Sequence, residues 1–227
     1  MQPYFFPYIG YFQLIAAVDM FIVYDNIKYT KKGWINRNRM LQNGKDVMFT
    51  IPLKSDSDYL KICEREISTD FSRDEFLNQF KETYKRAPYF SQTFPLVEKI
   101  VNYNNANLFL FLHNSLVKTC QHLGLTTNIR LSSDISINHE LRSQCKVLAL
   151  CKALDAHTYI NAIGGMELYS KEIFRENGLH LKFLKSKSLD YEQFGNSFIP
   201  WLSIIDVMMF NSTDTIRSCI LTNYELI

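Results

Sequence analysis

A short basic segment, KYTKKGWINRNRM, carries side chains suited to anion recognition. It contains five basic residues and no acidic residue: Lys28, Lys31, Lys32, Arg37 and Arg39. Arginine guanidinium groups match phosphate or carboxylate oxygens with two parallel hydrogen bonds. Trp34, Asn36 and Asn38 alternate with the arginines, so an extended chain places them on the opposite side from Arg37 and Arg39. The segment predicts a site for the phosphates of a nucleotide or activated sugar; the alternative is a solvated basic loop beside a surface tryptophan.

Two aspartates are the candidates for a general base. Asp206 lies one turn after Ser203 in an apolar helix, FIPWLSIIDVMMFNS, and Asp25 directly follows a predicted buried strand. A buried carboxylate requires a partner, so Asp206 is expected either to orient a cation such as Arg37 or to bond a helix terminus or loop amide. The preceding YEQF segment adds Tyr191 and Gln193, whose polar side chains we expect to bind polar groups of the substrate.

The opening segment, MQPYFFPYIGYFQLI, is rich in aromatic residues and proline and has no charged side chain. Gly10 follows Pro7 at the start of a predicted helix, where backbone amides can meet a phosphate. Tyr8 and Tyr11 flank this glycine, and we favour a role for these aromatics in the core and in a pocket wall. Gln2 and Tyr8 would supply the polar tips of that wall.

Two loops follow predicted strands and add further candidates for substrate binding. Ser132 and Ser133 come after NIRL, and Gly164 and Gly165 come after TYINA. Ligands of parallel sheets bind at the carboxyl ends of strands. The competing interpretation for the serines is helix capping, and a lone Gly-Gly pair is weak evidence.

Composition narrows the class of protein. The 227 residues fit one α/β domain, and a net charge of +2 does not indicate a nucleic-acid binder. Five cysteines without a C-x-x-C pair, and no secretory or membrane-spanning segment, predict a cytoplasmic protein with reduced thiols. The five histidines lack metal-ligand spacing, and no nucleotide-cofactor motif is present. We therefore expect neither a metal nor a cofactor.

Hydrophobic periodicity predicts the elements that must position these residues. We expect strands at 20–24, 46–53, 61–67, 157–161 and 179–185, and helices at 72–87, 107–123 and 139–156. The alternation of helix and strand in the last third favours a three-layer, Rossmann-like α/β fold with a mostly parallel sheet. The range 45–125 breaks that alternation and is interpreted as a strand-containing and helical insertion in a single domain, 1–227.

Taken together, these segments resemble the WbqC-like family of bacterial proteins. The resemblance rests on QPYFFPYIGYFQLI, KKGWINRNR, the Leu-Ser-Ser loop, TYINAIGG and FIPWLSIID, in this order along nearly the whole chain. Members often lie in gene clusters for O-antigen and other surface polysaccharides. They usually carry a few apolar residues before the Gln-Pro, as a first strand. Here Gln2 follows Met1 directly, so we expect a missing central strand and a true start upstream.

The resemblance implies a transferase of surface-polysaccharide biosynthesis that adds glycine or another aminoacyl group to an amino sugar. Its expected partner is a phosphate-bearing small molecule, a nucleotide-sugar or activated donor. Two alternatives stay open: a non-catalytic protein that binds a nucleotide-sugar or assembles pathway enzymes, and a transferase that uses charged tRNA as donor. The last predicts binding that weakens steeply with salt.

Overall fold

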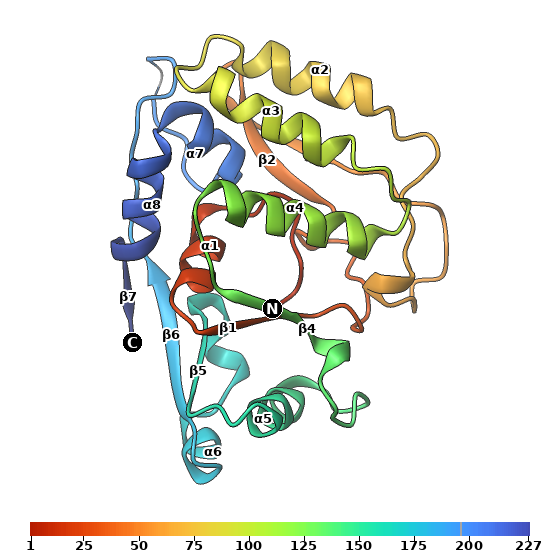
Figure 1. Ribbon diagram of the computed structural model, residues 1–227, viewed down its shortest axis with the longest axis vertical. Helices are drawn as coiled ribbons and strands as arrows, with labels where there is room; N and C mark the ends of the chain where they lie inside the picture. The colour runs from red at the N-terminus through yellow and green to blue at the C-terminus, as the bar shows by residue number, and fades with distance from the viewer. Residues whose placement is uncertain (196) are drawn as a thin grey trace.

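The computed structural model describes residues 1–195 and 197–227. It is a mixed α/β fold of helices and small sheets (Figure 1). The helices are α1 (Ile9–Ala16), α2 (Arg73–Tyr84), α3 (Phe90–Val101), α4 (Leu108–His122), α5 (Ser143–Ala153), α6 (Lys171–Glu176), α7 (Ile204–Phe210) and α8 (Thr213–Thr222). Three short 3-10 helices are η1 (Ile62–Glu64), η2 (Ser132–Asp134) and η3 (Ile163–Leu168).

The strands form three small sheets in the described part of the chain. They are β1 (Met20–Val23), β2 (Arg37–Gln42), β3 (Lys45–Thr50), β4 (Asn128–Leu131), β5 (Thr158–Ala162), β6 (His180–Ser186) and β7 (Tyr224–Leu226). β1 and β4 pair in parallel, β2 and β3 form an antiparallel hairpin, and β5, β6 and β7 form a sheet whose first two strands are parallel. The α/β class is confirmed. A three-layer, Rossmann-like fold around one mostly parallel sheet stays a prediction.

The range 45–125 contains β3, η1 and helices α2 to α4, which lie together on one side of the molecule (Figure 1). β3 pairs with β2, which precedes this range, so the hairpin crosses the boundary expected for an insertion. The prediction of a strand at 61–67 is wrong. The chain there forms η1 and isolated bridges to Lys28, Leu53 and Asn107, because its backbone partners lie on three separate segments.

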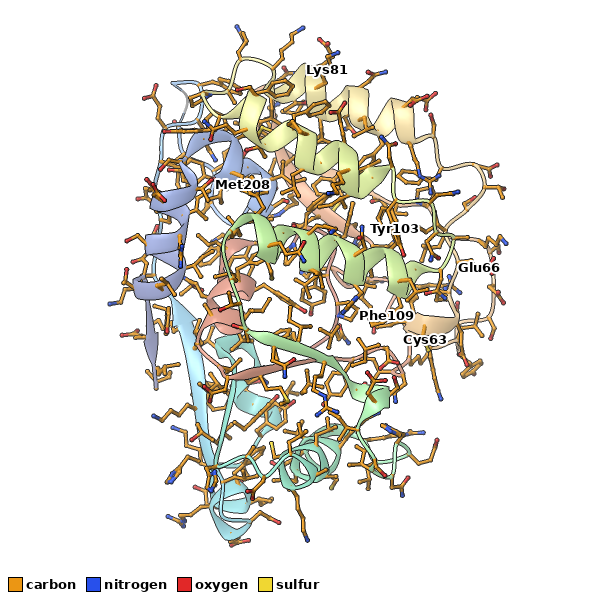
Figure 2. All side chains as sticks on the ribbon, in the orientation of Figure 1. Cys63, Glu66, Lys81, Tyr103, Phe109 and Met208 are labelled. Atoms are coloured by element: carbon orange, nitrogen blue, oxygen red, sulfur yellow. The ribbon has the colours of Figure 1, made fainter. Side chains whose placement is uncertain are left out.

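A core rich in phenylalanine joins the helices to the hairpin. Phe49 of β3 contacts the rings of Phe76 and Phe80 on α2, with centroids 5.9 and 5.0 Å apart. Ser72 begins α2 as expected, since its side chain accepts a hydrogen bond from the Glu75 amide. Figure 2 shows Phe109 on α4 and Met208 on α7 among these interior side chains; they are 3% and 1% exposed.

Residues far apart in the sequence hold the N-terminal segment in place. Asn38 donates its amide hydrogens to the carbonyls of Phe5 and Phe6, at 3.1 and 2.9 Å. Ser203, at the start of α7, donates its hydroxyl to the Phe6 carbonyl at 2.8 Å. Gln13 of α1 bonds two carbonyls at the end of α8, at 3.2 and 3.0 Å. The beginning and the end of the chain are therefore built into one structure.

Candidate functional site

The parallel pair of β1 and β4 brings two polar loops to the same edge of a sheet. The register runs from Met20 opposite Asn128 to Val23 opposite Leu131. The chain leaves β1 through Tyr24, Asp25 and Asn26, and it leaves β4 through η2. The carboxyl ends of parallel strands are where ligands of open α/β sheets bind.

Asp25 is a nearly buried carboxylate held by the loop after β4. It is 6% exposed, and its Oδ1 accepts hydrogen bonds from the Ser132 hydroxyl at 2.8 Å and the Ser133 amide at 3.1 Å. Burial raises the pKa of Asp25, but the hydrogen bonds from Ser133 and Ser132 outweigh it, and the pKa lies below its usual value. Asp25 is therefore ionised at neutral pH and can accept a proton or a hydrogen bond from a group placed beside it.

A buried lysine stands beside this carboxylate. Lys146 of α5 is 6% exposed and donates to the Asn26 side-chain oxygen at 3.2 Å and to the His139 carbonyl at 3.3 Å. Its amine also lies 5.7 Å from the centre of the Tyr24 ring. Burial lowers the pKa of Lys146, and the negative charge of Asp25 opposes this shift.

Asn26 links the two charged groups. Its side-chain oxygen accepts from Lys146 and lies 2.9 Å from the Ser132 hydroxyl, whose single proton it shares with Asp25. Its amide nitrogen lies 2.9 Å from His139 Nδ1, and because an amide N–H can only donate, the imidazole proton belongs on Nε2. We call Asp25, Asn26, Ser132, His139 and Lys146 the polar cluster. It can take a proton at one end and stabilise a negative charge at the other.

The arginines of the basic segment bond to the protein itself. Arg37 donates to the carbonyls of Gly33 and Lys32, at 2.9 and 2.6 Å, and so closes its own loop. Arg39 pairs with Asp46 at 2.9 Å, with its guanidinium 5.7 Å from the Trp34 ring. The geometry thus favours a structural role for both guanidinium groups.

The remaining members of the basic segment divide into buried amides and exposed amines. Asn36 is 7% exposed and bonds the Ile51 carbonyl, and Asn38, which is 5% exposed, holds the N-terminal segment. Lys31 pairs with Asp58 at 2.6 Å, and Lys32 is exposed beside it. Trp34 is 40% exposed. The residues of the basic segment that we expected to form one anion site are therefore divided between the core and the surface.

Asp206 is the centre of a buried hydrogen-bond network. It is 0% exposed and accepts from the hydroxyls of Tyr84 and Tyr191, at 2.8 and 2.6 Å, and from the Gln193 amide at 2.9 Å. Burial raises its pKa, against the lowering effect of these donors. Ser203 caps α7 by accepting from the Ile205 amide. These contacts favour a structural role over that of a general base.

The opening segment packs as a wall. Tyr11 donates to the Gln2 carbonyl at 2.8 Å, and the Tyr8 ring meets Trp201 edge-on at 5.7 Å. A Cβ on Gly10 would lie 2.3 Å from the Tyr8 hydroxyl oxygen and 2.5 Å from Ser186 Oγ, so a larger residue would displace these side chains. These contacts pack the opening segment as a wall, and a phosphate contact at Gly10 stays a prediction.

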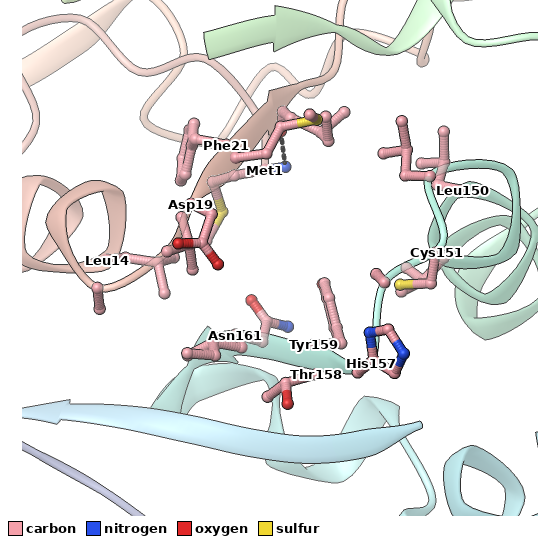
Figure 3. A pocket seen from close by; sticks show the side chains of 18 of the residues that line it. Met1, Leu14, Asp19, Phe21, Leu150, Cys151, His157, Thr158, Tyr159 and Asn161 are labelled. Carbon is pink, nitrogen blue, oxygen red and sulfur yellow. Dashed lines mark hydrogen bonds between the residues drawn. The ribbon is translucent and has the colours of Figure 1, made fainter. Parts of the chain in front are cut away.

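The loop after β5 contains a second close approach. A Cβ on Gly165 would lie 2.5 Å from the Asn161 side-chain nitrogen, whereas Gly164 faces open space. A cavity of about 430 Å³ opens next to β5, between that strand and β1 (Figure 3). Asn161 and Tyr159 line it from one side, and Met1 and Phe21 from the other.

The structure brings the predicted residues together in two places: Asp25, Ser132 and Ser133 meet where β1 and β4 end, and Tyr191, Gln193 and Asp206 meet in the buried network. Sequence reasoning missed the other members of the polar cluster, Asn26, His139 and Lys146. One signal for Lys146 was available: it occupies the same apolar face of its helix as Leu150, one turn later, where a lysine is unexpected. Among the described residues, no group of three or more His, Cys, Asp or Glu side chains is placed to hold a metal.

These features define a class: an α/β protein with a buried polar cluster where two parallel strands end. In the described part of the chain, no helix has both the length and the apolar character needed to cross a membrane.

The chain belongs to the WbqC-like protein family, whose model matches residues 2–218. It is also similar to the "Uncharacterized protein Rv1507c" of Mycobacterium tuberculosis (strain ATCC 25618 / H37Rv), with 28% identity over 227 aligned residues and 96% of each chain covered. No solved structure gives a significant match.

Proposed function

We propose that the protein is a transferase whose reaction takes place at the polar cluster. One observation carries this proposal: a carboxylate and an amine of opposite charge, each 6% exposed, lie at the carboxyl ends of two parallel strands. Charged groups are rarely buried to this degree unless they are paired or functional.

The reaction that suits the cluster is aminoacyl transfer to an amino sugar, with glycine as the first candidate group. The amine nitrogen of the sugar attacks the carbonyl carbon of an activated aminoacyl donor and forms a C–N bond. The Asp25 carboxylate takes the proton that the amine loses. Lys146 donates a hydrogen bond to the oxygen on which negative charge develops. The bond to the leaving group then breaks, and the leaving group receives the proton from Asp25.

The setting that we propose is surface-polysaccharide biosynthesis in the cytoplasm, and it is supported by the family resemblance. The substrate carries phosphate, as a nucleotide-linked or lipid-linked amino sugar does. Lys28 and Lys32 are exposed near the start of the basic segment and are available to phosphate oxygens. In this assignment, Arg37 and Arg39 stabilise the conformation of the basic segment.

The test combines ligand binding with turnover. The protein is incubated with nucleotide-amino sugars and with activated glycine donors, and products are followed by mass spectrometry while thermal stability reports binding. We expect one amino sugar to gain the mass of a glycyl residue. Asp25→Asn should lower kcat by about 10²- to 10⁴-fold, the typical effect of removing a general base. It should leave the thermal shift from the sugar nearly unchanged.

Asp134→Asn is the matched control, because Asp134 follows Ser133 on the same short helix but is exposed. It should keep wild-type turnover. Binding of a nucleotide-sugar without any product would instead favour a non-catalytic binding protein. Product formed only with charged tRNA, with binding that weakens steeply as salt rises, would favour the tRNA-dependent alternative.

A further inference from the structure

Trp201 presents an aromatic ring to solvent from an unfavourable backbone conformation. Its φ of 61° lies in the left-handed region, which glycine and asparagine adopt readily and a bulky residue does not. The side chain is 56% exposed, so burial of the indole does little to offset the cost of this conformation. Strained residues that their surroundings hold in place cluster at ligand-binding sites. The conformation of Trp201 therefore indicates a role other than packing.

The backbone around Trp201 is fixed by contacts with two other segments. Arg39 of β2 donates to the Trp201 carbonyl at 3.2 Å, and the Arg39 carbonyl accepts from the Ser203 amide at 2.9 Å. The Ile204 amide donates to the Pro7 carbonyl at 3.0 Å. A ring carried by such a fixed segment loses little conformational freedom when a ligand lies against it, which favours binding.

Tyr8 and Trp201 form the corner of a small cleft. Their ring centroids are 5.7 Å apart, and the ring planes meet at 69°. Rings at this angle cannot enclose a flat base between two parallel faces, but they can contact a face and an edge of a pyranose, both of which carry C–H groups. The cleft beside them has a volume of about 40 Å³ and admits a few atoms instead of a whole ring.

The lining of this cleft combines apolar side chains with two polar ones. The apolar side chains include Leu189, Pro200 and Val207, and the polar ones include Ser186, which ends β6, and the exposed Lys187. The Ser186 hydroxyl oxygen is buried and has no hydrogen-bond partner among the described residues. An unsatisfied buried hydroxyl costs free energy, and a polar group of a ligand that bonds to it would recover that cost.

We propose that this cleft binds a sugar ring. The C–H face of a pyranose lies on the Trp201 indole, and one exocyclic group of the sugar, a hydroxymethyl or an acetamido group, enters the cleft and bonds to the Ser186 hydroxyl. Apolar walls with a few placed polar groups are the usual composition of a small-molecule site. The cleft shares no residue with the polar cluster, and sugar binding here does not depend on the reaction proposed there.

The first experiment uses Trp34→Phe, which leaves Trp201 as the only tryptophan of the chain and so as a fluorescent reporter. This variant is titrated with the methyl glycosides of glucose, N-acetylglucosamine and xylose, and with adenosine and uridine. Xylose is the matched control, because its pyranose ring carries no exocyclic carbon.

We expect the glucoside or the N-acetylglucosaminide to change the Trp201 emission saturably, with a Kd on the order of 1 mM for so small a ligand. The xyloside should bind about tenfold more weakly, because it lacks the group that enters the cleft. Absence of a saturable change with every glycoside would overturn the proposal, as would tighter binding of either nucleoside.

Two further variants separate binding from folding, with ligand-detected NMR as the binding assay. Glycine adopts the backbone conformation of residue 201 without strain, so Trp201→Gly should keep the wild-type Tm or raise it while the affinity for the sugar falls by about tenfold or more. Ser186→Ala removes a hydroxyl that has no partner among the described residues, so it should keep the Tm and weaken binding by about fivefold. Sugar affinity retained in Trp201→Gly would overturn the proposal, and so would a Tm that falls in this variant, since the indole would then stabilise the fold.

Discussion

Asp206 and Asp25 are both buried carboxylates, but their surroundings differ in kind. Asp206 is 0% exposed, and its bonds come from Tyr84 on α2 and from Tyr191 and Gln193 on the segment before α7. Asp25 lies at a sheet edge, and its bonds come from the adjacent Ser132–Ser133 loop. Burial dominates in the first case and raises the pKa, whereas hydrogen bonds prevail in the second and lower it. The difference suggests that Asp206 holds the fold together and that Asp25 is available for chemistry.

The largest effect on stability is expected for Asp206→Ala. This change removes the buried carboxylate that accepts from the hydroxyls of Tyr84 and Tyr191 and from the side-chain amide of Gln193. Loss of one partner from a buried charged network typically costs about 3–5 kcal/mol. Urea unfolding should show this loss, and Asp134→Ala on the surface should change the free energy of unfolding by less than about 0.5 kcal/mol. A loss below about 1 kcal/mol for Asp206→Ala would contradict the structural role.

A smaller effect should separate the two tyrosines that bond Asp206. Tyr84 also accepts a hydrogen bond from the Leu41 amide at 3.1 Å, so Tyr84→Phe leaves both a carboxylate and a backbone N–H short of a partner. An unsatisfied buried group costs about 1–3 kcal/mol. Tyr191→Phe removes a donor to Asp206 but leaves no backbone N–H short of a partner, and it should cost about 1 kcal/mol. Chemical denaturation of the two variants should rank Tyr84→Phe as the more destabilising, and the reverse order would argue that Tyr191 is the principal partner.

The two aspartates should also respond to pH in opposite directions. The folded pKa of Asp206 lies above 3.8, so the folded state binds its proton more tightly than the unfolded chain does. Relative to Asp206→Asn, the wild type should therefore gain stability as pH falls toward 3.8. The folded pKa of Asp25 lies below 3.8, so its stabilising contribution is present above that pH and is lost as pH falls through the folded pKa.

Urea unfolding of the wild type, Asp25→Asn and Asp206→Asn at a series of acidic pH values measures both effects. The difference between wild type and Asp25→Asn should shrink as the solution becomes more acidic. The difference between wild type and Asp206→Asn should move in favour of the wild type. Curves that run parallel for both variants would show that the two carboxylates have similar environments.

Local signals in the sequence predicted several elements well. The cap at Ser72 and the apolar face at Phe76 and Phe80 placed α2 within a few residues, and the run MFIVY placed β1. These predictions succeed because each depends on residues that are close in the sequence. The strand expected at 61–67 failed because its alternating pattern arises from contacts with three separate segments instead of one neighbouring strand.

The site was harder to predict for the same reason. The loops after β1 and β4 could be found from strand patterns, so Asp25 and Ser132 were identified. Lys146 is 120 positions from Asn26, and Tyr84 is 122 positions from Asp206. Nothing in the local sequence distinguishes Arg37, which bonds its own loop, from an arginine that binds phosphate. Only the packed structure separates these roles.

The bonds that hold the N-terminal segment also constrain how the chain folds during synthesis. Gln13 is anchored by carbonyls 206 and 210 positions later, and Phe6 by a hydroxyl 197 positions later. A ribosome exposes the first of these residues long before it releases the last. Asn38 can hold Phe5 and Phe6 early in synthesis, but the bonds from Ser203 and to the end of α8 can form only when nearly the whole chain has emerged. Contacts of such long sequence separation slow folding and prolong the exposure of apolar surface. Yield in the cell should accordingly depend on chaperones that shield the first residues of the nascent chain.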